Sequence, residues 1–208
     1  MDRIPIKCLD NANLNVKCVG DGPSLFVIHG FTGDMTTWDH FVEKVKNEFF
    51  VISVDILGHG LSDSPVDPEL YDMQHTVDSL SSVLDYCGVR KVNWLGYSMG
   101  GRIALSTALA LPNRTAGLIV ESGSTGLASY KDRESRITSD SKLADWIEKV
   151  DIEEFVDYWE SLPLWASQIR LKRDQKRKLR SQRLRNNRLG LANSLRGMGT
   201  GVQPYVHE

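Results

Sequence analysis

Apolar runs and helix-like spacings alternate along the chain up to residue 122. Short runs rich in β-branched and aromatic side chains are typical of strands, whereas apolar positions three and four apart are typical of helices that bury one face. These patterns predict an opening hairpin over residues 4–9 and 14–19, then strands over 24–29, 49–55, 91–95 and 115–122. They predict helices over 36–46, 72–87 and 99–111. Strands that alternate with helices indicate the α/β class, with a mostly parallel sheet and helices on both faces.

The pattern changes after residue 130. Between residues 131 and 199 only the helical spacing recurs, with predicted breaks at Pro163 and near Gly190. Helices inserted after a sheet strand are expected to form a lid. We therefore divide the chain into a core over residues 1–129, a helical lid over 130–200, and a segment over 201–208 that would begin a further part of the core.

Residues 96–101 read Gly-Tyr-Ser-Met-Gly-Gly and join a predicted strand to a predicted helix. In that context Gly-x-Ser-x-Gly is the nucleophile elbow of an α/β-hydrolase, a sharp turn that holds the serine hydroxyl clear of the backbone. Gly96 and Gly100 lack the Cβ atoms that would collide there. The helix that starts near Met99 directs its positive end at the site. Ser98 is therefore the predicted nucleophile; the alternative is a plain strand-to-helix turn.

Serine chemistry of this kind also needs N–H donors for a developing oxyanion. The N–H of Met99 directly follows the nucleophile, and the N–H of Phe31 lies in the loop after the strand over 24–29. We expect His29 to organise that loop rather than to act as a base. For His59 two interpretations stay open, a buried structural residue or part of the active-site wall.

Basic residues give a further signal. Arg102 is four residues after Ser98, and so lies one turn along the same helix face, where it suits an anionic substrate or an ion pair with a nearby carboxylate. The stretch 170–188 holds ten Lys and Arg and one acidic residue, Asp174. It is interpreted as a solvated helix face, and its lack of aromatic residues does not favour nucleic-acid binding. One or two of its arginines could still point inward at carboxylates.

Composition is that of one globular domain, or one domain with a lid. The 208 residues are 41% hydrophobic and carry a net charge of −2, which does not favour a polyanion partner. No apolar stretch approaches the ~18 residues of a membrane span, and the first residues lack the apolar core of a signal peptide. The three cysteines have no metal-ligand spacing and are interpreted as reduced thiols of a cytoplasmic protein.

Four segments together resemble the 2-succinyl-6-hydroxy-2,4-cyclohexadiene-1-carboxylate synthases of menaquinone biosynthesis. Two of them, residues 29–33 and 96–102, are shared with many α/β-hydrolases. The other two lie in the lid, over 155–159 with 163–167 and over 195–204, and they discriminate better between families. The resemblance runs along essentially the whole chain.

The resemblance implies a lyase on the α/β-hydrolase fold, with no metal or organic cofactor. The family is understood to abstract a proton with a Ser-His-Asp triad and then to eliminate pyruvate from 2-succinyl-5-enolpyruvyl-6-hydroxy-3-cyclohexene-1-carboxylate. That substrate carries three carboxylates. The implied partner is therefore a small anionic molecule, and neither a nucleic acid nor a membrane.

The family's substrate-contacting arginines lie on the elbow helix, after the Gly-Leu pair that follows the sixth strand, and in the lid. Arg102 and Arg136 match the first two positions. Arg183 best matches the third, with Arg185 as the alternative register. Two aromatic residues also match family contacts, although packing is the default expectation for the lid tryptophans Trp146, Trp159 and Trp165. The implied substrate-binding set is Tyr97, Arg102, Arg136, Trp159 and Arg183.

In one respect the sequence departs from the family, whose catalytic Asp and His lie on loops after the final sheet strands. Those strands are absent from this sequence, and Glu121 and His207 are weak candidates for the two roles. Without a base, Ser98 should be a weak nucleophile. We therefore expect either a fragment of a longer enzyme or an impaired one, with little synthase activity from these 208 residues. An unpaired sheet edge would also favour marginal stability or oligomerisation.

Two further functions stay open from the sequence. A serine esterase or thioesterase would use the same elbow. A non-catalytic ligand-binding protein on the same scaffold would not need the missing triad members.

Overall fold

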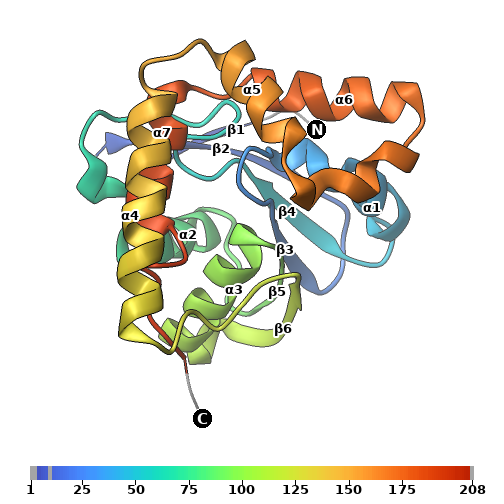
Figure 1. Ribbon diagram of the computed structural model, residues 1–208. Coiled ribbons are helices and arrows are strands. Elements are labelled where there is room, and N and C mark those ends of the chain that lie inside the picture. The colour runs from blue at the N-terminus through green and yellow to red at the C-terminus, as the bar shows by residue number, and fades with distance from the viewer. Residues whose placement is uncertain (1–3, 9–10, 207–208) are drawn as a thin grey trace.

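A six-stranded sheet forms the centre of the computed structural model, which describes residues 4–8 and 11–206 (Figure 1). The strands are β1 (Ile4–Lys7), β2 (Asn13–Val19), β3 (Ser24–Ile28), β4 (Phe50–Val54), β5 (Val92–Tyr97) and β6 (Thr115–Glu121). Their order is β1-β2-β4-β3-β5-β6. The pairs β1–β2 and β2–β4 are antiparallel, and the pairs β4–β3, β3–β5 and β5–β6 are parallel. The predicted α/β fold class, with its mostly parallel sheet, is confirmed.

Helices cover both faces of the sheet. One face packs on α2 (Met73–Tyr86) and α3 (Met99–Ala110), with Phe26 and Ile28 of β3 pointing toward them. The alternate residues of β3, Leu25 and Val27, face the short helix η2 (Met35–Trp38) and α1 (Asp39–Val45). Because successive strand residues point to opposite faces, one apolar run supplies both cores. Two further single-turn helices, η3 (Pro68–Tyr71) and η4 (Pro112–Arg114), lie in the connections.

The lid consists of α4 (Tyr130–Ile147), α5 (Ile152–Ser161), η5 (Pro163–Arg170), α6 (Arg173–Leu184) and α7 (Arg188–Met198). The long helix α4 runs beside α7 (Figure 1). A separate apolar core joins α4, α5 and α7 through Ile147, Phe155 and Leu191. The lid therefore has its own packing and rests on the sheet domain along α7.

Both predicted breaks in the lid are confirmed. The chain breaks at Pro163, where η5 begins, and again over residues 185–187, between α6 and α7, although α7 itself continues through Gly190. The interruption lies before it, where the side chain of Asn187 caps α7 by accepting from the N–H of Gly190 at 3.2 Å. The glycine is needed for close approach rather than for a turn, because a Cβ there would lie 2.4 Å from the carbonyl oxygen of Gly58.

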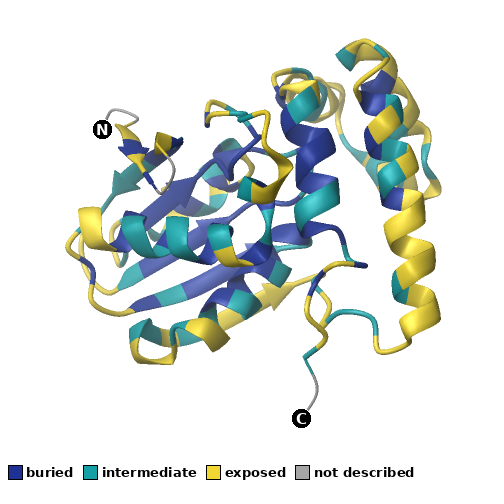
Figure 2. Cartoon of the chain, turned by 90° about the vertical axis from the view of Figure 1, so that its left-hand side faces the viewer, coloured by how far each residue is buried: buried dark blue, intermediate teal, exposed yellow. Residues whose placement is uncertain are grey.

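The edge strand β6 is less covered than the rest of the sheet (Figure 2). Its apolar residues Leu118, Ile119 and Val120 are 37%, 59% and 37% exposed, although neighbouring residues of a strand face opposite sides. In the described part of the chain, β6 therefore has solvent on both faces. No helix among the described residues is both long and apolar enough to cross a membrane.

Candidate active site

Ser98 lies at the turn from β5 to α3, with φ 53° and ψ −113°. This backbone region favours glycine, so a serine there is strained. The turn is also tight, because a Cβ on Gly96 would lie 2.1 Å from the carbonyl oxygen of Gly100. The Ser98 N–H donates to the carbonyl oxygen of Glu121 at 2.8 Å, which fixes the turn to the end of β6. The geometry is that of a nucleophile elbow.

A cavity of about 220 Å³ lies beside Ser98, between α3 and the lid. Arg102 of α3 and Arg136 of α4 supply its positive charge, and Tyr97 lines it next to the serine. Its apolar wall comes mainly from the lid, through Leu143, Trp159, Leu164, Trp165, Leu195 and Met198. The structure thus brings together at one cavity four of the five residues predicted to contact substrate.

Of the two arginines, only Arg136 is paired with a carboxylate. The Arg136 Nε lies 2.8 Å from both side-chain oxygens of Asp140, which is itself buried. Arg102 donates instead to neutral acceptors, the carbonyl oxygen of Met198 at 2.6 Å and Oε1 of Gln203 at 3.2 Å. No described carboxylate lies within ion-pair distance of Arg102. The cavity therefore carries an excess of positive charge.

Burial lowers the pKa of Arg102 to about 10, helped by the charge of Arg136 and opposed by Asp140. Arg102 stays protonated at neutral pH, but its charge is poorly solvated. An anion in the cavity would supply the counter-charge that this guanidinium lacks.

The predicted oxyanion donors lie at the same cavity. Met99 is the first residue of α3, and its N–H has no acceptor within the helix because it lies in the first turn. Phe31 lines the cavity from the loop after β3, where its ring packs edge-on against Trp159 at 5.3 Å between centroids. Both residues line the same cavity as Ser98, and their role as oxyanion donors stays a prediction.

Two buried histidines lie behind this loop. His29 uses both ring nitrogens on the backbone: Nδ1 lies 2.8 Å from the carbonyl oxygen of Gly30, and Nε2 accepts from the N–H of Ile56 at 3.0 Å. The His59 Nδ1 lies 3.3 Å from the carbonyl oxygen of Leu57. Burial, with a smaller effect of His29, lowers the pKa of His59 to about 3, so this imidazole is neutral. Both residues order the loop and neither is placed as a base.

Among the described residues, no imidazole or carboxylate accepts a hydrogen bond from the Ser98 hydroxyl. Glu121 touches the elbow only through its backbone, and it is exposed on β6. His207 lies outside the described residues. Nor do the described His, Cys, Asp and Glu residues gather into a group of three that could hold a metal ion.

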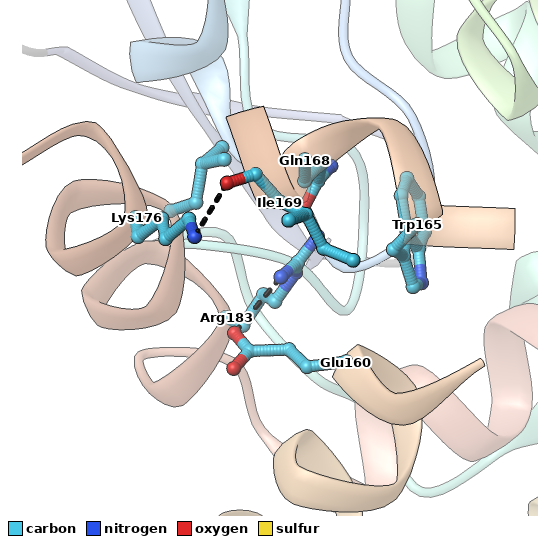
Figure 3. A pocket seen from close by; sticks show the side chains of 7 residues that line it. Glu160, Trp165, Gln168, Ile169, Lys176 and Arg183 are labelled. Carbon is cyan, nitrogen blue, oxygen red and sulfur yellow. Dashed lines mark hydrogen bonds and ion pairs between the residues drawn. The ribbon is translucent and has the colours of Figure 1, made fainter. Parts of the chain in front are cut away.

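Arg183 lines a neighbouring pocket rather than the cavity beside Ser98 (Figure 3). It is buried, donates to Glu160 at 2.8 Å and to Gln168 at 3.2 Å, and its Cζ lies 4.9 Å from the centre of the Trp165 ring. Trp165 lines both spaces, and Arg183 also lines a third pocket together with Phe31 and Tyr97, which belong to the cavity beside Ser98. Arg183 as a substrate contact stays a prediction.

The alternative register, Arg185, places its guanidinium on Asp34. Asp34 is buried and also accepts from Gln182 at 2.7 Å. Arg185 thus attaches α6 to the loop after β3 and does not reach the cavity. Most other basic residues of 170–188 are exposed, as expected for a solvated helix face.

Three residues that hydrogen-bond to the cavity arginines were not singled out from the sequence. Asp140 had a readable signal, since it stands four residues after Arg136 on one helix. Met198 and Gln203 gave no such signal, because they meet Arg102 only through the return of the chain after α7.

The chain matches the family model described as alpha/beta hydrolase fold over residues 23–198. It is 42% identical to a putative 2-succinyl-6-hydroxy-2,4-cyclohexadiene-1-carboxylate synthase of Bacillus subtilis (strain 168), over 99% of this chain and 76% of that protein. It is 31% identical to the synthase of that name from Citrobacter koseri, over 88% of this chain and 69% of the relative.

Solved structures show the same similarity. The structure of MenH from S. aureus superposes with a TM-score of 0.86 at 32% identity, over 91% of this chain and 73% of that one. A thermophilic esterase from Thermogutta terrifontis, solved with malate bound, gives a TM-score of 0.83 at 26% identity, over 99% of this chain and 74% of that one.

Proposed function

Because the chain belongs to the alpha/beta hydrolase fold family, with synthases of menaquinone biosynthesis among its relatives, we propose that it serves the reaction those synthases are named for. The reaction eliminates pyruvate from 2-succinyl-5-enolpyruvyl-6-hydroxy-3-cyclohexene-1-carboxylate and yields 2-succinyl-6-hydroxy-2,4-cyclohexadiene-1-carboxylate. The protein is an enzyme of the lyase type, and its substrate is a small molecule.

One observation carries the proposal: two guanidinium groups line the cavity beside Ser98, and the one carboxylate that they meet, Asp140, binds Arg136 from outside the lining. A neutral ester gives no reason to bury Arg102 without a carboxylate partner, whereas a substrate with three carboxylates does. Arg102 and Arg136 would bind carboxylates, and the lid tryptophans would pack on the ring. The substrate would then lie with an acidic C–H near the Ser98 hydroxyl.

In the proposed chemistry Ser98 takes part in removing that proton, and the backbone N–H groups of Met99 and Phe31 stabilise the oxyanion that forms. The bond between the ring carbon and the enolpyruvyl oxygen then breaks as the new ring double bond forms. The enolate that leaves takes up a proton and becomes pyruvate. Ser98 needs a proton acceptor for this step, and the described residues do not supply one at hydrogen-bond distance. We therefore rest the test on binding as well as on turnover.

The experiment compares Arg102→Met and Arg136→Met with a matched control, Arg133→Met. Arg133 lies on α4 too, but donates only to backbone oxygens, at 2.9 Å to that of Leu127. Each cavity variant should weaken binding of the tricarboxylate substrate by about 30-fold or more, because a charge-assisted contact worth about 2 kcal/mol is lost. Calorimetry measures binding, and a coupled assay measures pyruvate release. Equal affinities in all three variants would contradict the proposal.

A serine esterase is the second candidate, favoured by the strained elbow and by similarity to a solved esterase. It predicts hydrolysis of a p-nitrophenyl ester that is abolished by Ser98→Ala and insensitive to Arg136→Met. A non-catalytic binding protein is favoured by the lack of a described partner for the serine hydroxyl. It predicts tricarboxylate binding that Ser98→Ala leaves unchanged, with no turnover of either substrate.

A further inference from the structure

Two of the three cysteines lie next to each other on the side of the sheet that carries α2. Cys18 is in β2, and Cys87 is the residue that ends α2. They are 69 positions apart in the sequence, yet their sulfur atoms are 3.5 Å apart. Both residues are half-buried. Neither lines the cavity beside Ser98, so the elimination chemistry gives no reason for the pair.

The surrounding structure holds each member of the pair in place. Cys18 pairs with Ile52 across the β2–β4 ladder, which fixes the strand that carries it. The Cys87 N–H closes the last turn of α2 on the carbonyl oxygen of Val83 at 3.0 Å. Gly88 follows with φ 65° and turns the chain toward β5. The two sulfurs therefore meet because the strand and the helix end that carry them meet. A disulfide requires that they approach from 3.5 Å to the ~2.05 Å of a covalent bond.

We propose that Cys18 and Cys87 form a reversible intramolecular disulfide when the protein meets a peroxide. In the first step the Cys87 thiolate attacks hydrogen peroxide, which gives a sulfenic acid on Cys87 and releases hydroxide. In the second step the Cys18 sulfur attacks that sulfenic sulfur, the S–S bond forms, and water leaves. Each disulfide consumes one peroxide, and a small thiol reverses the reaction by exchange.

The hydrogen bond between the sulfurs assigns the two roles. It lowers the pKa of Cys87, while the same hydrogen bond, together with burial, raises the pKa of Cys18. Cys87 is thus the cysteine of the pair that forms the thiolate more readily and attacks the peroxide, and Cys18 is the thiol that resolves the sulfenic acid. The third cysteine, Cys8, is buried, and burial raises its pKa. Its sulfur lies 3.6 Å from two backbone oxygens, so it serves as an internal control.

The disulfide would join β2 to the connection between α2 and β5, the strand that ends at Ser98. The disulfide would close a loop between two cysteines that are 69 positions apart, and so would restrict the unfolded chain. Oxidation should therefore raise the midpoint of thermal unfolding by several degrees. Because the cavity is not involved, binding of an anionic ligand should not change.

The test treats the folded 208-residue protein with hydrogen peroxide, blocks free thiols in acid, and digests without reduction. Cleavage after Lys and Arg puts the three cysteines on separate peptides, 8–17, 18–44 and 47–90. We expect one cross-linked species, 18–44 with 47–90, that disappears after dithiothreitol, and Cys8 still free. Cys87→Ser should abolish it, and Cys18→Ser should leave a sulfenic acid that a dimedone probe traps on residue 87.

A parallel sample is oxidised in urea, where the fold no longer holds Cys18 beside Cys87. We expect a mixture of disulfides there, including some that involve Cys8. The proposal is overturned if the folded protein gives that same mixture, or if both thiols stay free. It is also overturned if Cys87 proceeds to sulfinic acid while Cys18 is still present. These readouts use the wild-type chain, so they decide the question even if a cysteine variant fails to fold.

Discussion

The guanidinium of Arg102, on the elbow helix, donates a hydrogen bond of 2.6 Å to the backbone oxygen of Met198, the last residue of α7. This contact joins the helix that carries Ser98 to the lid. Because Arg102 bonds only to neutral oxygens, the ligand-free protein bears the cost of a charge that burial leaves poorly solvated.

Arg102→Met should therefore make the ligand-free protein more stable, by about 1 kcal/mol. The fall of its pKa to about 10 corresponds to roughly 3 kcal/mol of unfavourable burial. The two hydrogen bonds that the substitution removes had stabilised the fold by about 1 kcal/mol each. Urea unfolding measures the difference. Arg133→Met is the control, since that arginine bonds only to backbone oxygens at the start of α4. Greater destabilisation by Arg102→Met than by the control would refute the argument.

Ser98→Gly should also stabilise the fold, by about 1 kcal/mol. Relief of the backbone strain at residue 98 should raise the free energy of unfolding by about 1–3 kcal/mol. The greater conformational freedom of glycine in the unfolded chain should lower it by about 0.5–1 kcal/mol. Ser98→Ala keeps the Cβ and should change stability little. Ser106→Gly, in the body of α3 where glycine is unfavourable, should instead lose about 1 kcal/mol. Thermal unfolding of the three variants separates the backbone effect from loss of the hydroxyl.

Acid should destabilise the protein partly through His59. The unfolded chain takes up a proton on this residue near pH 6.5, whereas the folded protein does so only near pH 3. Between those values the unfolded state binds more protons, so stability falls as the pH falls, by about 3 kcal/mol from pH 6.5 to about pH 4. His29 and Asp34 act on the same ring, the first disfavouring and the second favouring its charge.

Denaturant titrations at several pH values test this contribution. His59→Gln should flatten the loss of stability between pH 6.5 and about pH 4, whereas His40→Gln, at an exposed position, should leave the slope unchanged. Parallel slopes for wild type and His59→Gln would show that other groups carry the acid sensitivity.

The exposed edge strand β6 should make the 208-residue chain self-associate at high concentration. Ile119 is 59% exposed on this open edge. The edge strand can pair with the edge strand of a second copy, or its apolar side chains can pack against that copy. A lysine on an edge strand opposes such pairing, so Ile119→Lys should shift the sedimentation profile toward the monomer. Leu109→Lys, on an exposed position of α3, is the control. A wild-type protein that stays monomeric at all concentrations contradicts the prediction.

Local spacing explains what the sequence could predict. The elbow occupies six consecutive residues, and Arg102 follows Ser98 by one helical turn, so their relation survives any tertiary arrangement. The strands were readable for the same reason, since burial on both faces leaves continuous apolar runs in β3 and β4.

Tertiary contacts explain what the sequence could not predict. Arg183 and Arg185 are two residues apart in one basic helix, and only the positions of Glu160 and Asp34 decide where each side chain goes. Likewise, Gly190 marks the predicted break only approximately. Glycine usually weakens a helix, but Gly190 lies within α7, where the loop at Gly58 approaches closely, and the break itself precedes Arg188.

The unequal number of guanidinium and carboxylate groups at the cavity has a kinetic consequence. The chain as a whole is slightly acidic and repels a trianion at long range, so the attraction is confined to the mouth of the site. Association with such a ligand should then slow as salt is added, even though the net charge of the protein has the opposite sign to the cavity. Stopped-flow measurements that found no ionic-strength dependence would show that diffusion is not guided by this local field.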